Sequence, residues 1–129
     1  SFYGPFRNAV GSKKNLKFDK KTYQMDYSNS NEAIREIGFD IKEGADIVMV
    51  KPGMPYLDII RNIKDKFKIP VFAYQVSGEY TLIKNGIKNK TINSDAIFES
   101  LISFKRAGAS AIVTYFALEI AKQLKNPNH

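Results

Sequence analysis

Three short apolar runs constrain the fold of this chain more than any other feature. They lie at 46–50, 70–74 and 111–115, and amphipathic segments separate them. The first run, Asp46-Ile47-Val48-Met49-Val50, is apolar at consecutive positions, which is typical of a parallel strand buried on both faces. Because strands and helices alternate along the chain, we expect an α/β fold in which right-handed crossovers join the strands of a parallel sheet.

Helical periodicity accounts for most of the other residues. We predict helices at 31–43, 57–67 and 117–125, a helix that begins after Asn93 or Ser94 and ends at Gly108, and a short helix around 80–87. Ser30 is the expected cap of the first helix, and Gly44 is its expected end. A loop at 75–79 precedes the short helix. Residues 1–31 have no sustained period and are predicted to be a loop segment.

An internal similarity narrows the choice of sheet. The segment 43–51 aligns with 107–115, and this alignment places Lys51 and Tyr115 at the carboxyl-terminal tips of two alternate strands. In a (β/α)8 barrel, alternate strands contribute to the same layer of side chains, and the catalytic face lies at these tips. Flavodoxin-like and Rossmann sheets also fit the alternation, but the chain has neither GxGxxG nor GxxxxGK[ST]. A whole barrel takes about 250 residues. We therefore expect about three βα units from the carboxyl-terminal part of a TIM barrel.

Charge and residue types exclude several classes of protein. The 129 residues include no cysteine and a single histidine, His129, so thiol chemistry and multi-histidine metal sites are excluded within them. No apolar run approaches the ~18 residues of a membrane span. The net charge is +7, from 20 Lys and Arg against 13 Asp and Glu. Most of these lysines are scattered among acidic residues, but a cluster at 13–21 leaves a basic nucleic-acid-binding module open as an alternative.

Lys51 is the strongest catalytic candidate because it ends an apolar strand and precedes Pro52. Apolar surroundings lower the pKa of a lysine amine toward neutrality, which leaves the amine free to act as a nucleophile. The alternative is a lysine that reaches solvent from the end of the strand.

Four further residues are candidates, each with an ordinary structural alternative. Ser77 precedes Gly78 after the second strand, where its hydroxyl and nearby N–H groups suit a carboxylate or phosphate, or cap a helix. Tyr115 is either an interior aromatic or a hydroxyl donor. Arg7 is either a bidentate carboxylate clamp or a surface arginine. Glu36 has the position of a solvated carboxylate on its helix.

Six sequence blocks, taken together, are far more specific than any single residue. They are Phe2-Tyr3-Gly4-Pro5-Phe6-Arg7, Tyr23-Gln24-Met25, Met49-Val50-Lys51-Pro52-Gly53-Met54-Pro55-Tyr56-Leu57-Asp58, Tyr74-Gln75-Val76-Ser77-Gly78-Glu79-Tyr80, Lys105-Arg106-Ala107-Gly108-Ala109 and Thr114-Tyr115-Phe116. In this order they resemble the carboxyl-terminal part of the 5-aminolevulinate dehydratase (porphobilinogen synthase) family, over essentially the whole chain.

The resemblance implies a hydro-lyase that condenses two 5-aminolevulinate molecules into porphobilinogen, with loss of two waters, in tetrapyrrole synthesis. It implies a TIM barrel in which 1–31 form a lid over the active site and 32–129 form the last βα units. By this resemblance Lys51 forms the Schiff base with one substrate, and Ser77 and Tyr115 hold the carboxylate of that substrate. By the same resemblance, Arg7, Lys20 and Gln24 bind the carboxylate of the second substrate. Lys20 stands where the family usually has an arginine, so it keeps the charge without the planar fork.

Cofactor and partners are also implied by the resemblance alone. Glu36 matches a position that contributes to a magnesium site in some members, so we expect a divalent metal, Mg²⁺ or zinc, and no organic cofactor. We expect a homo-oligomer, an octamer for the full-length protein, in the cytoplasm or in a plastid, without nucleic-acid or membrane partners. A second Schiff-base lysine is expected upstream of Ser1, and the 129 residues alone are expected to be inactive and to fold poorly. A different Schiff-base aldolase or lyase on the same barrel is the main alternative.

Overall fold

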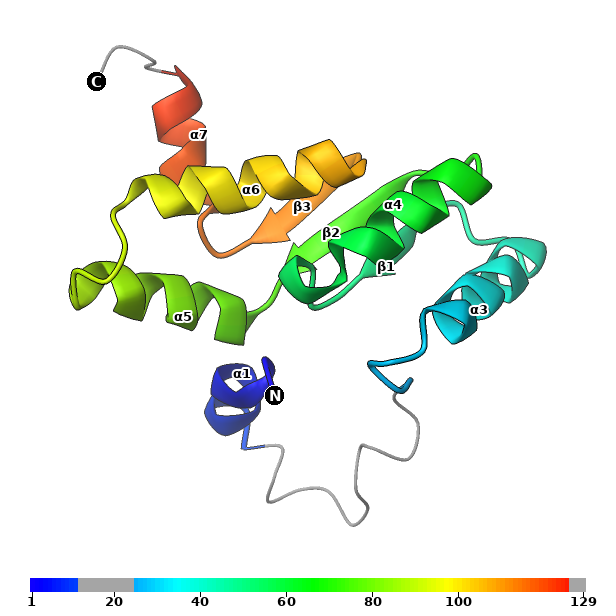
Figure 1. The fold of residues 1–129 in the computed structure, drawn as a ribbon, viewed down its shortest axis with the longest axis horizontal. Helices are drawn as coiled ribbons and strands as arrows, with labels where there is room; N and C mark the ends of the chain where they lie inside the picture. Colours follow the sequence, from blue (N-terminus) through cyan, green and yellow to red (C-terminus); the bar gives the residue numbers. More distant parts are fainter. Residues whose placement is uncertain (12–24, 126–129) are drawn as a thin grey trace.

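The fold is built on a small parallel sheet. A computed structural model of the chain describes residues 1–11 and 25–125. Within these residues, β1 (Val48–Val50), β2 (Val71–Gln75) and β3 (Ala111–Thr114) pair in parallel in the order β1-β2-β3 (Figure 1). The predicted parallel α/β sheet is confirmed, and each strand lies within two residues of its predicted position.

Two helices cover one face of this sheet. α4 (Leu57–Lys66) and α6 (Asp95–Ala107) both lie in front of the strands in Figure 1. Four buried residues of α6 follow the i, i+3, i+4, i+7 spacing of a single helix face, and three isoleucines of α4 are buried as well. The buried residues of the two helices are Ile97, Ser100, Leu101 and Phe104 in α6, and Ile59, Ile60 and Ile63 in α4. The core of the molecule therefore lies between the sheet and these two helices.

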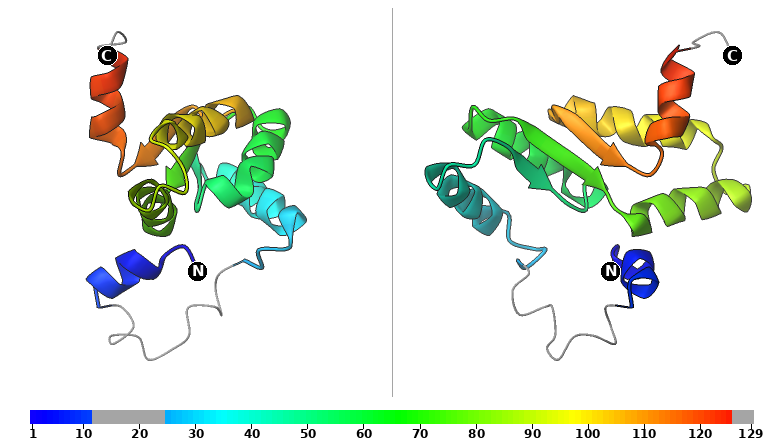
Figure 2. Two further views of the ribbon diagram at one scale, coloured as in Figure 1. Left: turned by 60° about the vertical axis from the view of Figure 1, so that its left-hand side comes forward. Right: turned by 180° about the vertical axis from the view of Figure 1, so that it is seen from behind.

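The strand side chains alternate between two faces, which we call the covered face and the open face. The covered face, toward α4 and α6, carries Val48, Val50, Val71, Ala73, Gln75, Ile112 and Thr114; the open face carries Met49, Phe72, Tyr74, Ala111 and Val113. Met49 is 45% exposed and Val113 is 38% exposed. The prediction that the first strand is buried on both faces is therefore wrong, because no described helix lies across the open face (Figure 2, right).

The first long helix, α3 (Ser30–Lys42), begins one residue earlier than predicted. Its cap is Asn29 rather than Ser30, because the Asn29 side chain accepts a hydrogen bond from the Glu32 N–H at 3.1 Å. The helix ends before Gly44, which has a φ of +100° as expected for a glycine beyond a helix end.

Two segments differ from the prediction because packing forms helices where the sequence shows no clear period. α5 (Ser77–Lys88) begins at Ser77, inside the predicted loop 75–79. In the predicted loop segment 1–31, Pro5 lies in the first turn of α1 (Gly4–Ala9), which packs beside the start of α5. Such a short helix shows no period of its own and depends on tertiary contacts.

Two more elements complete the fold. A 3-10 turn, η2 (Met54–Tyr56), leads into α4, and α7 (Ala117–Lys125) follows β3 at its predicted position. None of the helices in the two described ranges has the length and apolar character that a membrane span requires.

Candidate active site at the carboxyl ends of the strands

Three predicted site residues follow the three strands at one edge of the sheet. Lys51 comes directly after β1, Tyr115 comes directly after β3, and Ser77 is separated from β2 by one residue. Because the strands are parallel, their carboxyl ends lie at the same edge, so the sheet topology brings these three residues to one side of the molecule.

Lys51 is exposed, so the expectation that apolar residues bury its amine is wrong for the described part of the chain. The reason is the open face: Lys51 follows the alternation of Met49, and no described element covers that side of the sheet. The backbone at Lys51 is held nonetheless, because the hydroxyl of Tyr3 donates a hydrogen bond to the Lys51 carbonyl at 2.9 Å. The amino-terminal segment thus contacts the end of β1.

Ser77 is buried and contacts the same amino-terminal segment. Its hydroxyl oxygen accepts a hydrogen bond from the Phe6 N–H at 3.0 Å, and the Gly78 N–H donates to the Phe2 carbonyl at 2.7 Å. A Cβ at Gly78 would overlap the Phe2 backbone, so only glycine allows this close approach. Since a serine hydroxyl also carries one proton, Ser77 can donate to a ligand while it accepts from Phe6.

The predicted lid residues are only partly described. Arg7 lies on α1, half-buried, with its guanidinium carbon 5.3 Å from the centre of the Tyr3 ring. Because Phe6 contacts Ser77 and Tyr3 contacts Lys51, Arg7 lies in a segment joined to both of these residues. Lys20 and Gln24 lie outside the described residues, as does the lysine cluster at 13–21.

Tyr115 belongs to a group of tyrosines at the edge of the open face. Its ring lies 5.4 Å from that of Tyr80 in α5, and half of its surface is exposed. A side-chain hydrogen bond with Tyr115, together with burial, raises the pKa of Tyr74, the last open-face residue of β2. Tyr115 thus lies beside the Tyr80 ring and the Tyr74 hydroxyl.

Glu79 is the main site residue that the sequence reasoning missed. It is 1% exposed, and its carboxylate accepts hydrogen bonds from the N–H groups of Val76, Gly53 and Met54. Burial raises the pKa of Glu79, and the three backbone hydrogen bonds act in the opposite direction. Its place as the third residue of α5 is a known capping position and was the signal available in the sequence.

The turn after Lys51, which Glu79 holds, has no space for a side chain at position 53. A Cβ at Gly53 would overlap the Phe104 ring of α6, with its Cζ at 2.9 Å, and would lie 3.2 Å from the Tyr74 carbonyl oxygen. The turn that follows Lys51 is therefore shaped by the core beneath it as well as by its own sequence.

A buried polar network supports the ends of β2 and β3. Gln75, fully buried, donates from Nε2 to the Ser100 hydroxyl at 3.0 Å and accepts at Oε1 from the Thr114 hydroxyl at 2.7 Å. Thr114 in turn accepts from the Phe116 N–H at 3.1 Å, which fixes the backbone on both sides of Tyr115. A glutamine in an otherwise apolar strand was the sequence signal for this network.

The described residues do not build a metal centre. Glu36 is exposed on α3, as expected of a solvated carboxylate, and no group of three or more His, Asp or Glu side chains that could hold a metal ion exists in 1–11 and 25–125. Glu36 could supply one carboxylate ligand, but Mg²⁺ and zinc require several, so the described residues alone do not complete such a site.

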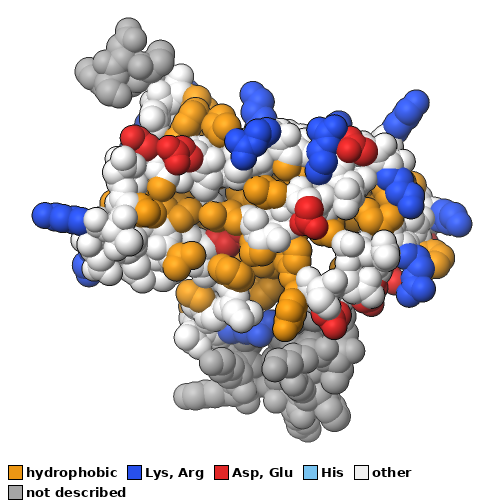
Figure 3. All heavy atoms as spheres, viewed as in Figure 1, with side chains coloured by type: hydrophobic (Ala, Val, Ile, Leu, Met, Phe, Trp, Pro, Cys, Tyr) orange, Lys and Arg blue, Asp and Glu red, His pale blue; other side chains and the backbone are white. Residues whose placement is uncertain are grey.

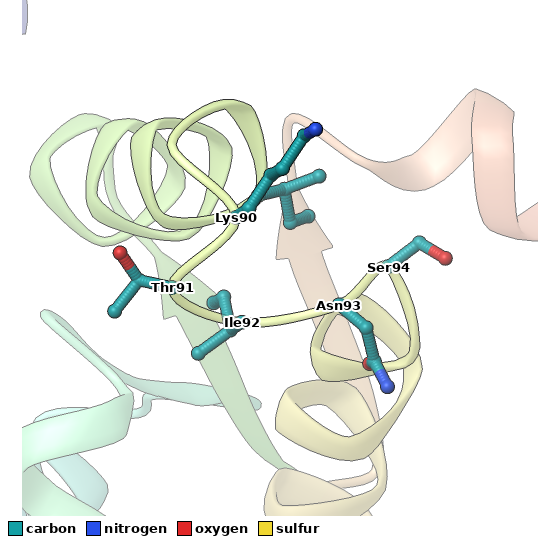
Figure 4. A pocket seen from close by; sticks show the side chains of 6 residues that line it. Lys90, Thr91, Ile92, Asn93 and Ser94 are labelled. Carbon is teal, nitrogen blue, oxygen red and sulfur yellow. The ribbon is translucent and has the colours of Figure 1, made fainter.

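Surface hollows lie away from the strand ends. One is lined by Phe98, Glu99, Ile102 and Arg106 on the outer side of α6. Another lies at the connection between α5 and α6, where the side chains of residues 90–94 spread outward (Figure 4). Lysines and arginines are spread around the edge of the face drawn in Figure 3, where hydrophobic side chains gather nearer the middle. None of these features includes Lys51, Ser77 or Tyr115.

Comparison with known proteins decides the family. The sequence model described as delta-aminolevulinic acid dehydratase matches residues 1–123. The chain belongs to this family. Within it, the chain is 57% identical over 126 residues to the delta-aminolevulinic acid dehydratase of Bradyrhizobium diazoefficiens, and 56% identical over 126 residues to that of Archaeoglobus fulgidus. Each alignment covers 97% of this chain, and it covers 36% and 38% of the two relatives respectively.

A solved member of the family has the same local structure. The crystal structure of the dehydratase (porphobilinogen synthase) from Toxoplasma gondii, in complex with the reaction product porphobilinogen, matches 95% of this chain with a TM-score of 0.90 and 54% identity. The match covers 35% of that protein. The chain thus spans about a third of the length of its relatives.

Proposed function

We propose that the protein to which these residues belong is a porphobilinogen synthase, and that this chain supplies the Schiff-base half of its active site. The reaction joins two molecules of 5-aminolevulinate into porphobilinogen and releases two waters. One observation carries the proposal: Lys51, Ser77 and Tyr115 follow three adjacent parallel strands at one edge of the sheet, in a chain that is 54% identical to a structure containing that product.

The chemistry at Lys51 begins with its side-chain nitrogen. The unprotonated amine adds to the ketone carbon of 5-aminolevulinate, and the resulting carbinolamine loses water to give an imine. This imine is a better electrophile than the ketone, and it keeps the substrate attached during the condensation. The hydroxyls of Ser77 and Tyr115 hold the substrate carboxylate without placing another charge beside the amine.

The second substrate is assigned to the lid. In this proposal Arg7, Lys20 and Gln24 bind its carboxylate, and residues 1–31 form a lid over residues 32–129. The described contacts that support a lid are those of Tyr3 with Lys51 and of Phe6 with Ser77. They put the segment that carries Arg7 beside the Schiff-base residues.

The proposal also includes the TIM barrel. The open face carries Met49, Tyr74 and Val113, and Lys51 and Tyr115 continue the same alternation. In a closed barrel this face would be the interior, and further strands would remove Met49 and the stem of Lys51 from water. A divalent metal (Mg²⁺ or zinc) near Glu36, a homo-octamer, and a cytoplasmic or plastid location rest on the family resemblance alone.

Trapping the imine tests the proposal. The protein, purified as its gene encodes it, is incubated with 5-aminolevulinate and sodium borohydride, and its peptides are analysed by mass. We expect a stable secondary amine on the peptide that contains Lys51. Lys51→Met removes this adduct and lowers porphobilinogen formation by at least about 10³-fold. Lys68→Met changes an exposed lysine before β2 and serves as the control. We expect this variant to retain both the adduct on the Lys51 peptide and the formation of porphobilinogen.

Two outcomes would contradict the assignment. Undiminished pyrrole formation by Lys51→Met excludes Lys51 as the imine-forming residue. An adduct with other keto acids, but none with 5-aminolevulinate, favours a different Schiff-base aldolase or lyase on the same fold.

A further inference from the structure

Glu79 is a buried acid that the proposed chemistry does not use. It is the third residue of α5, and only 1% of its surface is exposed. Burial of a carboxylate is costly unless hydrogen bonds compensate for the lost water. The partners that Glu79 uses therefore show what its position in the fold provides.

The carboxylate of Glu79 joins two turns of the active-site edge. Oε1 accepts from the Met54 N–H at 2.6 Å, and Oε2 accepts from the Val76 N–H at 2.5 Å and from the Gly53 N–H at 3.4 Å. Gly53 and Met54 belong to the turn after Lys51, and Val76 precedes Ser77. The Gly53 N–H also donates to the Tyr74 carbonyl at 2.8 Å, so β2 contacts the same turn.

The negative charge of Glu79 also acts on the amino-terminal segment. Burial and then the Glu79 charge raise the pKa of Tyr3 to about 12. Tyr3 therefore keeps the proton that it donates to the Lys51 carbonyl up to a higher pH than an ordinary tyrosine would. The backbone of Lys51 is thus held through Tyr3 on one side and through Gly53 and Met54 on the other.

Capping of α5 does not require the hydrogen bonds that Glu79 accepts from Gly53 and Met54. The hydrogen bond from Val76 alone caps the helix, as is usual for a glutamate at this position. The bonds from Gly53 and Met54 come from a turn 25–26 residues earlier in the chain. They link Lys51 and Ser77 through one rigid, desolvated group.

We propose that Glu79 is a positioning residue for Lys51 and Ser77, whose carboxylate ties the turn after β1 to the start of α5 and so fixes the separation of the amine and the hydroxyl. This inference rests on the proposed function, because it assumes that the substrate spans these two groups. Misplacement of reacting groups by about 1 Å can cost a rate factor of about a hundred, so a tie of this kind affects catalysis without touching the substrate.

The test uses Glu79→Gln, which keeps the size of the side chain but turns an NH₂ group toward backbone N–H donors. Two controls are matched to it. Glu119→Gln removes an exposed carboxylate, and Ile63→Val removes a buried methylene group from α4, whose side chain makes no hydrogen bond to Glu79. Glu79→Asp keeps the charge with a shorter reach and provides a second variant should Glu79→Gln fail to fold. All variants are made in the protein as its gene encodes it.

Two measurements are made on each variant. The first is amide hydrogen exchange at Gly53 and Met54, which we expect to be at least about tenfold faster in Glu79→Gln than in the controls. The second is the rate of borohydride-trapped imine formation on Lys51 at saturating 5-aminolevulinate, per folded protein. We expect it to fall by between about ten- and a hundredfold in Glu79→Gln, to fall less in Glu79→Asp, and to be unchanged in both controls.

The outcomes separate this inference from the proposed function. If exchange at Gly53 and Met54 in Glu79→Gln matches that in Ile63→Val, Glu79 does not hold the turn, and the inference is overturned. If exchange rises but imine formation per folded protein does not change, Glu79 is a structural cap and nothing more. Absence of an adduct on Lys51 in the unaltered protein overturns the proposed function, and the exchange rates still decide whether Glu79 ties the two turns.

Discussion

The two faces of the sheet serve different purposes although the same strands form both. On the covered face, Val71 and Ala73 are fully buried, and both polar side-chain atoms of the buried Gln75 have a hydrogen-bond partner. On the open face, Met49 and Val113 stay exposed, and tyrosine hydroxyls gather at the strand ends. Stability comes from one side and the candidate chemistry lies on the other, so substitutions on the two faces should have separable effects.

Phe104→Ala should have the largest effect on stability. The ring is fully buried between α6 and the sheet, and removing it leaves a cavity under the turn that follows Lys51. We expect the free energy of unfolding to fall by about 3–5 kcal/mol, measured by urea denaturation. Phe98→Ala, on the exposed side of the same helix, is the matched control and should cost far less. Equal losses would mean that α6 does not cover the sheet as described.

A pair of valines tests the comparison directly. Val71 on the covered face is 0% exposed, and Val113 on the open face is 38% exposed. If the open face stays uncovered in the protein as its gene encodes it, Val71→Ala should lower the free energy of unfolding by about 2 kcal/mol, and Val113→Ala by well under half of that. If the barrel proposal is right, the cost of Val113→Ala in that protein approaches that of Val71→Ala. A cost that stays low there would argue against a closed barrel.

Thr114→Val tests the polar part of the covered face. The substitution keeps the shape of the side chain but removes the hydroxyl that donates to Gln75 and accepts from Phe116. We expect a loss of about 1.5 kcal/mol in the free energy of unfolding, because a buried amide oxygen loses its donor. Gln75→Leu in the same background should recover part of the loss, since no unpaired oxygen then remains. A double-mutant cycle measures this coupling.

Tyr3→Phe should have the smallest effect on stability. We expect the free energy of unfolding to fall by about 1 kcal/mol or less, because the substitution removes one hydrogen bond at an exposed contact. The pH dependence of the stabilisation that Tyr3 provides is more informative than the size of this loss. The folded-state pKa of Tyr3 is about 12, above the ordinary value of 10.0, so the associated stabilisation is present below pH 10 and is lost as the pH rises through 12. Ultraviolet titration of the phenolate, compared between the unaltered protein and Tyr3→Phe, checks this sign. A Tyr3 transition near pH 10 would show that the segment is undocked.

The sequence predicted the sheet well because strand positions depend on local apolar runs and on the alternation with helices. The ends of α3 and α6 followed glycine positions, as Gly44 and Gly108 show. The start of α5 was missed because it depends on contacts that are distant in sequence: Phe2 approaches Gly78, and Glu79 accepts hydrogen bonds from Gly53 and Met54.

The sequence identified candidate residues that follow the strands, but it did not fix the surroundings of their side chains. These residues could be found because Lys51 and Tyr115 repeat the same position after two strands. The sequence left open whether Lys51 is buried or reaches solvent, because an apolar run does not reveal which face a helix will cover; in the structure Lys51 is exposed. The roles of all the predicted site residues stay predictions: Lys51, Ser77, Tyr115, Arg7, Lys20, Gln24 and Glu36. Lys20 and Gln24 lie outside the described ranges.

The contact between Gly53 and Phe104 has a consequence for natural variation and for engineering. An aromatic ring from α6 occupies the volume that a side chain at position 53 would fill. A larger residue at 53 therefore requires a smaller one at 104, so substitutions at the two positions must be made together. Grafting a turn with a side chain at this position into the chain would therefore require exchange of the helix residue below it as well.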